Sequence, residues 1–263
     1  MAASEARSEP KANGVMKLGV LIPCFDHGST VGAVVEALAP SGLPCLLVDD
    51  GSGPATRDVL ESLAKHHAFV EVERHATNRG KGAALKTGYR AAAARGWEGA
   101  IQLDADGQHD PADVKLFARA MQAHPGALVL GVPVFDASVP RVRLYARQLS
   151  RGLVWLACLS RGIPDPLCGF RGIPLARTLG VLDRVRTGDR MDFEPEIAVR
   201  LFWEGVPVVT LPTRIVYPHG GVSHFSLARD YPLLASLYVR LLAGMLPRAT
   251  ALRRRARAAR EDR

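Results

Sequence analysis

Apolar and polar positions alternate in blocks along the first half of the chain. Short apolar runs that each end in a polar or glycine-containing turn predict buried strands; they cover residues 17–25, 43–52, 69–74 and 99–106. Segments with apolar residues at helical spacing lie between them and predict helices; they cover residues 29–39, where a capped start is expected, 55–67 and 83–96. This alternation over about 110 residues predicts an α/β fold, with a doubly wound, mostly parallel sheet flanked by helices and ligands bound at the carboxyl ends of the strands.

The second half of the chain is less regular. Its pattern predicts helices at 113–123, 141–162 (long and amphipathic) and 193–205, strands at 127–132 and 206–218, and a loop at 219–226. The last apolar run, Tyr231 to Leu246, contains Arg240 and begins next to Asp230, which makes it too short and too charged for a membrane-spanning helix. Two possibilities stay open for it: a helix in a membrane interface, or a terminal helix packed on the domain.

The ends of the chain differ from its centre. Residues 1–16 are polar and show no secretion signal, so we expect a disordered start, a main domain at 17–228, and a C-terminal helix with an arginine-rich tail at 229–263. Of the net charge of +8, much comes from the seven arginines from Arg248 onward, which outnumber Glu261 and Asp262. Such a tail suits an anionic membrane surface or nucleic acid, or is simply a solvated end.

The cysteines do not indicate a disulfide framework or a zinc site. Cys24, Cys45, Cys158 and Cys168 lie in apolar or tight-turn contexts without CxxC spacing. We therefore expect four buried thiols in a cytoplasmic protein.

Three polar segments carry candidate chemistry. In "LDADGQHD", Asp104, Asp106 and Gln108 form an all-oxygen set suited to Mg²⁺ or Mn²⁺, and two carboxylates at i and i+2 of a strand end point the same way. A segment of this kind on its own is more often an ordinary acidic turn, here with His109 and Asp110 as part of it. "VDDGSG" is a second acidic strand end, and "NRGKGAALKTG" places glycines and basic groups at a helix start, where an anion is favoured. The latter has neither the P-loop nor the dinucleotide pattern.

Together, several segments resemble inverting family-two glycosyltransferases, in the branch that contains dolichyl-phosphate mannose synthases and bacterial polyprenyl and lipid glycosyltransferases. The segments are "IPCFDHGSTVGAVVEAL", "LLVDDGSG", "NRGKGAALKTGYRAA", "IQLDADGQHDP", "DPLCGFRG", "FEPEIAVRLFWEGVPVVTLP" and "GGVSHF", in that order, and they span residues 20–225. The resemblance implies a GT-A (Rossmann-like) fold, a UDP- or GDP-sugar donor, and Mg²⁺ or Mn²⁺ as cofactor.

The resemblance also implies roles for individual residues. Asp49 would contact the nucleoside with Asp50 beside it, Asp104 the ribose or sugar side of the donor, and Asp106 and Gln108 the metal at the diphosphate. The remaining donor-binding candidates are Pro23, Lys81, Arg147 and Arg171.

Catalytic and acceptor-side candidates come from the last two segments. Besides Asp106, they are Glu194 and Glu196, of which Glu196 better matches the family's acidic position. An alcohol acceptor requires a general base, whereas an ionised lipid phosphate does not. His219, Ser223 and His224 lie in the predicted lid or acceptor loop, where lipid-phosphate synthases carry Arg and Lys instead.

The leading hypothesis is therefore metal-dependent sugar transfer to a lipid-linked acceptor in cell-envelope glycoconjugate or lipid synthesis. It implies a peripheral protein on the inner face of the plasma membrane, held by anionic lipid, with no nucleic acid partner. Two alternatives stay open: a sugar-phosphate nucleotidyltransferase, which uses a similar sheet but needs a basic glycine-rich loop after the first strand, and a non-catalytic basic module.

Overall fold

The computed structural model describes residues 15–134, 141–215 and 227–261. Its strands are β1 Leu18–Cys24, β2 Cys45–Asp49, β3 Val70–Arg74, β4 Gly99–Gln102, β5 Leu128–Val134, β6 Arg171–Pro174 and β7 Val208–Arg214. Its α-helices are α1 Gly28–Leu38, α2 Pro54–His66, α3 Lys81–Ala94, α4 Val114–Ala123, α5 Arg141–Cys158, α6 Leu175–Arg184, α7 Phe193–Trp203, α8 Leu227–Met245 and α9 Ala249–Glu261. Short 3₁₀ turns lie at Ala39–Ser41, Pro111–Asp113 and Leu246–Arg248.

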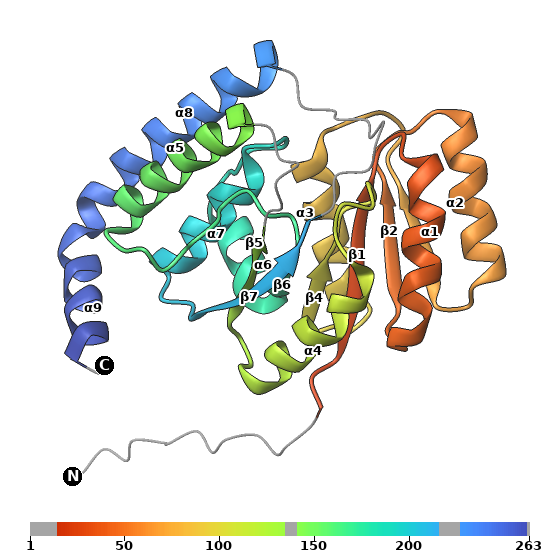
Figure 1. Ribbon diagram of the computed structural model, residues 1–263, viewed down its shortest axis with the longest axis horizontal. Coiled ribbons are helices and arrows are strands. Elements are labelled where there is room, and N and C mark those ends of the chain that lie inside the picture. The colour runs from red at the N-terminus through yellow and green to blue at the C-terminus, as the bar shows by residue number, and fades with distance from the viewer. Residues whose placement is uncertain (1–14, 135–140, 216–226, 262–263) are drawn as a thin grey trace, which may run out of the picture.

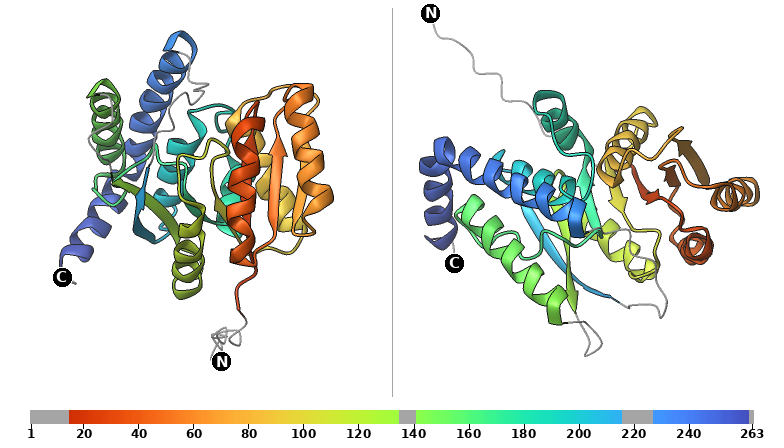
Figure 2. Two further views of the ribbon diagram at one scale, coloured as in Figure 1. Left: turned by 45° about the vertical axis from the view of Figure 1, so that its right-hand side comes forward. Right: turned by 90° about the horizontal axis from the view of Figure 1, so that it is seen from above.

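The strands form one sheet in the order β3-β2-β1-β4-β6-β5-β7. β3, β2, β1 and β4 run parallel, as do β5 and β7, while β6 is antiparallel to both of its neighbours. Helices cover both faces of the sheet (Figures 1 and 2), with α1, α2 and α4 on one side and α3, α6 and α7 on the other. The predicted mostly parallel sheet between layers of helices is therefore confirmed.

Three elements were missed by the sequence pattern, and one of them is α9, which forms in the predicted arginine-rich tail. β6 has only four residues, one of them the buried Arg171, so no apolar run marks it. α6 buries Leu175, Thr178 and Val181 at helical spacing, but it follows β6 directly, without an intervening turn.

Several predicted boundaries are corrected by the structure. α3 begins at Lys81, because Gly80, with φ of +104°, ends the preceding loop. α1 begins after His27 without the expected side-chain cap. α5 ends at Cys158, before the residue Leu159 with φ of +50°.

The most consequential correction concerns β4, which ends at Gln102. Asp104 and Asp106 therefore lie in the loop after the strand, and strand alternation is the wrong reason for expecting their side chains to point the same way.

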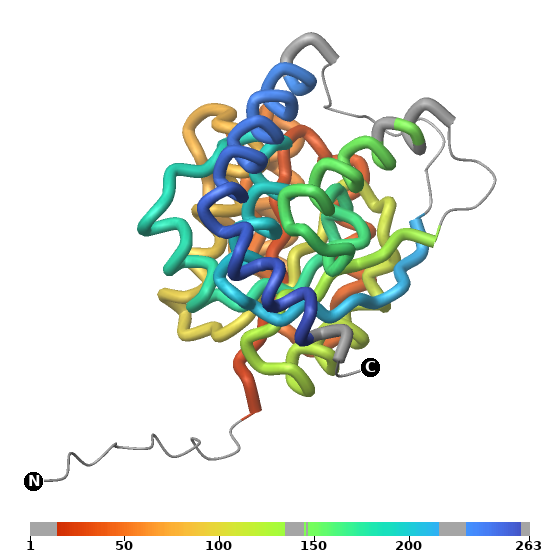
Figure 3. Tube along the Cα trace, turned by 90° about the vertical axis from the view of Figure 1, so that its left-hand side faces the viewer, coloured from red at the N-terminus to blue at the C-terminus, as the bar shows by residue number. Residues whose placement is uncertain are grey.

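The C-terminal helices lie against the domain. Figure 3 shows α8 and α5 side by side on one surface, and Leu237 and Leu241 of α8 belong to the same apolar cluster as Leu130 of β5 and Val199 of α7. Of the two possibilities for the last apolar run, packing on the domain is thus observed. Among the described helices, none is both long and apolar enough to cross a membrane.

The tail and the start of the chain are also partly held by the domain. In α9, Arg255 Nη1 donates to the carbonyl of Trp203 at 2.9 Å. In the 3₁₀ turn before α9, the guanidinium of Arg248 lies 4.9 Å from the Trp203 ring centroid. Of the start predicted to be disordered, residues 1–14 lie outside the described part, while Met16 exchanges two backbone hydrogen bonds with the side chain of Gln122.

The prediction of four buried thiols is confirmed. Cys24, Cys45, Cys158 and Cys168 are all buried and free. Burial raises the pKa of each thiol to about 12, so none is activated for nucleophilic chemistry.

Candidate active site

An ion-pair cluster joins three elements near the carboxyl end of β4. Nζ of Lys81, the first residue of α3, lies 2.7 Å from Oδ1 of Asp104 in the loop after β4. The same ammonium lies 2.8 Å from Oε2 of Glu194 in the first turn of α7. These three side chains are 8–20% exposed, so they open to solvent only slightly.

Glycines at two close approaches bring these elements together. A Cβ on Gly82 would lie 2.5 Å from Cβ of Phe193, and a Cβ on Gly169 would lie 2.2 Å from Oδ2 of Asp104. Only glycine allows the start of α3 to meet α7 and the "CGFR" segment to meet Asp104. The three sequence segments around Lys81, Asp104 and Glu194 are therefore one site in space.

Charge in this cluster sets the ionisation of its members. Burial alone would lower the pKa of Lys81, but the charges of Asp104 and Glu194 raise it above its ordinary value. Burial would raise the pKa of the Asp104 carboxyl, but the Lys81 ammonium holds it below its usual range. Both groups are therefore charged at neutral pH.

For Asp106 the Lys81 charge compensates less than it does for Asp104. Burial, and then the negative charge of Asp104, raise the pKa of Asp106 to about 6. Its Oδ1 accepts a hydrogen bond of 3.0 Å from the backbone N–H of Gln108. A buried carboxylate with a raised pKa marks a place where an added positive charge is favoured.

The residues after β4 suit a divalent cation through their oxygen ligands. Within the described part of the chain, no three His, Cys, Asp or Glu side chains come together to hold a metal ion. Asp106 and Gln108 instead carry side-chain oxygens, which are hard ligands, in the loop that also carries Asp104. Such a set fits Mg²⁺ or Mn²⁺ when a substrate diphosphate completes the coordination.

The acidic residues at the carboxyl end of β2, Asp49 and Asp50, accept hydrogen bonds from neighbouring segments. Asp49 accepts from Nε of Arg74 at 2.9 Å and from the N–H of Ser52 at 2.8 Å. Asp50 accepts from the N–H groups of Arg79 and Gly80, and lies 2.7 Å from Nδ1 of His75. Both carboxylates thus fix the loops around the predicted nucleoside position, and their contact with a donor stays a prediction.

Pro23 lies in β1 and is paired in register with Val48 of β2. It is buried and close to the carboxyl end of its strand. Its predicted role in donor binding is likewise untested.

The two arginines predicted at the donor differ in their surroundings. Arg171 is completely buried, and its guanidinium donates to the carbonyls of Cys168, Glu194 and Pro166 at 2.6–2.7 Å. It braces the loop that carries Gly169 and contributes positive charge near Asp104. Arg147 of α5 pairs with Asp165, and a role at the donor stays a prediction for both.

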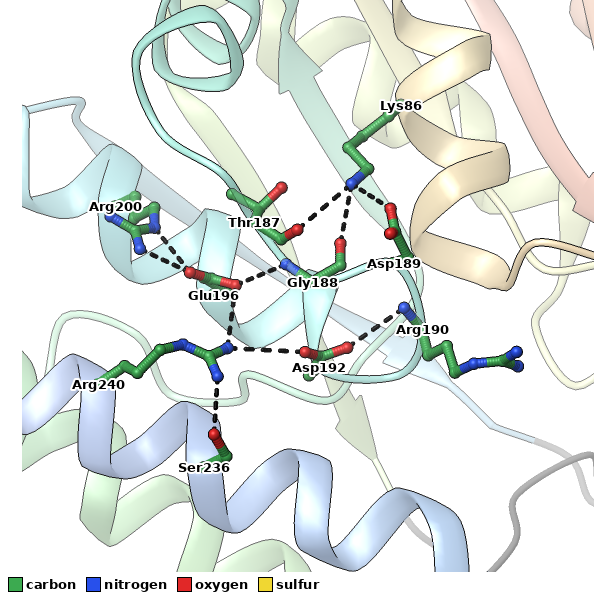
Figure 4. A network of polar contacts seen from close by, with 10 residues as sticks. All are labelled: Lys86, Thr187, Gly188, Asp189, Arg190, Asp192, Glu196, Arg200, Ser236 and Arg240. Carbon is green, nitrogen blue, oxygen red and sulfur yellow. Dashed lines mark hydrogen bonds and ion pairs between the residues drawn. The ribbon is translucent and has the colours of Figure 1, made fainter.

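Glu196 belongs to a separate network (Figure 4). Its Oε1 accepts from Arg200 at 2.6 and 2.9 Å and its Oε2 from the N–H of Gly188 at 2.9 Å. Arg240 of α8 lies 3.7 Å from both Glu196 and Asp192. Of the two acidic candidates in "FEPEIA", the geometry therefore favours Glu194, not Glu196, at the Asp104 cluster.

Sequence reasoning missed two polar residues of the site. Gln102, within the apolar β4, donates from Nε2 to Oε1 of Glu194 at 2.6 Å, and a polar residue inside a buried strand was a usable signal. His109, assigned to the turn, is 6% exposed, and its ring lies edge-on to Phe170 with centroids 5.4 Å apart; burial lowers its pKa. His219, Ser223 and His224 lie outside the described residues.

The known proteins to which the chain is similar are glycosyltransferases. A family model described as "Glycosyl transferase family 2" matches residues 19–169. An undecaprenyl-phosphate mannosyltransferase of Micrococcus luteus is 26% identical over 223 residues, covering 80% of this chain and 88% of the relative. A dolichyl-phosphate β-glucosyltransferase of Trichomonas vaginalis is 32% identical over 132 residues, covering 48% of this chain and 40% of the relative.

The fold also resembles a solved structure. A mannosyltransferase from Pyrobaculum calidifontis, in complex with GDP-Man and Mn²⁺, superposes with a TM-score of 0.56 at 18% identity. The match covers 92% of this chain and 75% of the other. At this identity the likeness concerns the fold.

Proposed function

Because the chain belongs to glycosyl transferase family 2 and is a glycosyltransferase, we propose that it transfers a sugar, with inversion, from a UDP- or GDP-sugar to a lipid-phosphate acceptor. Family membership sets aside the nucleotidyltransferase and the non-catalytic module. The observation that carries the proposal is the placement of Lys81, Asp104 and Glu194 in one cluster beside Asp106 and Gln108.

On the donor side, the proposal assigns the diphosphate to the loop after β4. Asp106 and Gln108 would hold Mg²⁺ or Mn²⁺, which when bound neutralises negative charge on the diphosphate as it leaves. Lys81 adds a permanent positive charge at the same place, and Asp104 and Glu194 fix the position of its ammonium. Holding this charge in place before the reaction favours the transition state over the bound donor.

On the acceptor side, the proposal gives Glu194 no role as a general base. Its two oxygens are engaged by the amide of Gln102 and by Lys81. An ionised phosphate acceptor needs no base: its oxygen forms the bond to the anomeric carbon, while the bond to the nucleotide diphosphate breaks and its electron pair leaves with the diphosphate. The names of the undecaprenyl-phosphate and dolichyl-phosphate relatives support this acceptor class.

A membrane-facing surface is also part of the proposal. Tyr145, Leu149 and Leu156 lie along one ridge of α5. Tyr231 and Val239 of α8, with Leu246 of the 3₁₀ turn that follows it, form a second apolar ridge, and all six side chains are 46–74% exposed. The two helices lie side by side (Figure 3), and the exposed Arg253, Arg254 and Arg257 of α9 follow in the chain. Apolar ridges near arginines suit the surface of an anionic bilayer, so we assign residues 229–263 to membrane association at the inner face of the plasma membrane.

A donor and acceptor panel tests the proposal. The full chain is mixed with UDP- and GDP-sugars, Mn²⁺ and vesicles containing polyprenyl phosphate, and nucleotide release and lipid mass are followed together. The expected result is one donor that yields nucleoside diphosphate and a glycosyl-phosphate lipid of matching mass. Nucleoside diphosphate release without any glycosylated lipid would reject the acceptor class, and no turnover with any donor would reject the nucleotide-sugar assignment.

A further inference from the structure

A chain of buried polar contacts continues from the Lys81 cluster into the core. The hydroxyl of Tyr89 in α3 lies 2.6 Å from Oε1 of Gln102, and Nε2 of Gln102 lies 2.6 Å from Oε1 of Glu194. Beyond Glu194, the contacts with Lys81 and Asp104 complete the series. We call Tyr89 and Gln102 the relay residues, and the series of contacts that runs from them through Glu194 to Lys81 and Asp104 the relay.

The direction of each hydrogen bond in the relay follows from its acidic end. The carboxylate of Glu194 can only accept, so the amide nitrogen of Gln102 must face it and the amide oxygen must face Tyr89. The hydroxyl of Tyr89 therefore donates. Burial raises the pKa of Tyr89 well above its ordinary value, which keeps this proton in place.

Both relay residues are shielded from water. Tyr89 and Gln102 are 0% exposed, and Tyr89 lies in the apolar cluster with Leu85 and Phe193. If the hydroxyl were missing, the amide oxygen of Gln102 would be left buried without its donor. The hydroxyl thus holds the Gln102 amide from the side opposite Glu194.

We propose that Tyr89 and Gln102 are positioning residues that set the place of Glu194, and through it the ammonium of Lys81 that faces the donor diphosphate. The inference rests on the proposed function insofar as Lys81 acts on the diphosphate. Because a displaced ammonium weakens stabilisation of the leaving group more than binding of the donor, the relay affects kcat more than KM.

Three variants separate positioning from simple stability. Tyr89→Phe removes only the hydroxyl, Gln102→Met removes both polar ends of the amide, and the double variant leaves no unpaired polar atom of this pair. Kinetics and melting temperature are measured for each. Tyr238→Phe is the matched control, since it removes another buried tyrosine hydroxyl, in α8.

We expect Tyr89→Phe to lower kcat about 3- to 10-fold and Gln102→Met, which removes a hydrogen bond to a charged group, about 10- to 100-fold, with donor KM changed much less. In the double variant the melting temperature should be at least that of Tyr89→Phe, while kcat stays as low as in Gln102→Met. Recovery of kcat together with the melting temperature, or equal effects of Tyr89→Phe and the control, would overturn the proposal.

A readout without substrate keeps this test independent of the proposed function. In protein with ¹⁵N-labelled lysine, the ζ-amino signal of Lys81, assigned with Lys81→Met, should shift in Tyr89→Phe and Gln102→Met but not in Tyr238→Phe. An unmoved signal would reject the relay even if the enzyme is active. A moved signal in a protein that turns over no nucleotide-sugar would support the relay and reject the proposed function.

Discussion

Lys81 and Glu194 form an ion pair of 2.8 Å between the first residue of α3 and the first turn of α7. The pair matters because the same ammonium reaches Asp104 at 2.7 Å. The second acidic residue of the same helix turn, Glu196, faces a different set of partners. Two glutamates two positions apart are thus assigned to separate tasks, and this difference can be tested.

Glu194→Gln should lower turnover more than stability. The change keeps the size of the side chain but removes the charge that holds Lys81, so we expect kcat/KM to fall by about 10- to 100-fold, as for loss of a hydrogen bond to a charged group. Steady-state kinetics with the active donor measure it. An unchanged kcat/KM would contradict the assignment of Glu194 to the site.

Glu196→Gln should lower stability more than turnover. Removing one member of a buried ion pair costs about 3–5 kcal/mol, and because Arg200 is 17% exposed we expect about 2–3 kcal/mol. Denaturant unfolding of both variants measures the difference. If Glu196→Gln were as stable as the wild type and lost more turnover than Glu194→Gln, the result would support the predicted catalytic role of Glu196 and contradict the assignment of Glu194 to the site.

Manganese affinity should depend on pH through Asp106. The pKa of this carboxyl is raised to about 6, so a proton competes with the cation below that pH. We expect the affinity for Mn²⁺ with nucleoside diphosphate to rise up to about tenfold per pH unit below pH 6 and to level off above it. Calorimetric titrations from pH 5 to 8 measure this profile.

The stability of the metal-free protein should change in the opposite sense. Because the pKa of Asp106 is higher in the folded state than in the unfolded state, its contribution to stability is fully present below the unfolded pKa, near 4, and is lost as the pH rises through about 6. Asp106→Asn should remove this component of the pH dependence. A variant with the same pH profiles as the wild type would show that another group titrates.

Arg171 should behave as a bracing residue when replaced. Arg171→Met leaves three buried carbonyls without a donor, each at a cost of about 1–3 kcal/mol, so the melting temperature should fall sharply. Arg171→Lys keeps the charge but not the three-way geometry, and should lose part of this stability. Full stability of Arg171→Lys combined with weaker nucleotide binding would instead favour a direct contact with the donor.

The ridges of α5 and α8 should govern binding to anionic vesicles. Leu149→Glu and Val239→Glu each place a charge on an exposed apolar ridge, so we expect sedimentation with phosphatidylglycerol vesicles to weaken about tenfold or more. Leu116→Glu is the matched control, because Leu116 is 45% exposed but lies on α4. Equal binding by the ridge variants and the control would contradict the membrane-facing surface.

The sequence predicted the layered fold because its strongest signal is local. Apolar runs such as Val20 to Ile22 and helical spacing such as Leu60 and Leu63 reflect burial on one element, and both are confirmed. β6 was not predicted, because a four-residue strand with a buried arginine has no periodic pattern. The surroundings of α8 were not predicted, because apolar spacing alone does not say whether a helix packs on a bilayer or on another helix such as α5.

The site was only partly predictable for a related reason. Motifs identified Lys81, Asp104, Asp106 and Glu194 as candidates, but the choice of Glu194 over Glu196 depends on which side of α7 faces α3. That orientation is set by the close approach of Gly82 to Phe193, which no local pattern shows. Gln102 contacts side chains of two helices on one face of the sheet, so its partners became visible only when α3 and α7 were placed together.

The central claim is that the loop after β4 holds a metal and the diphosphate of a nucleotide-sugar. Its most direct test is calorimetric titration of the wild type and Asp106→Asn with UDP and GDP, each with Mn²⁺ and with EDTA, at pH 7.5. We predict that the wild type binds one of the two nucleotides at least tenfold more tightly with Mn²⁺, and that Asp106→Asn loses this gain. Equal affinity with Mn²⁺ and with EDTA, or a full gain in Asp106→Asn, would contradict the account.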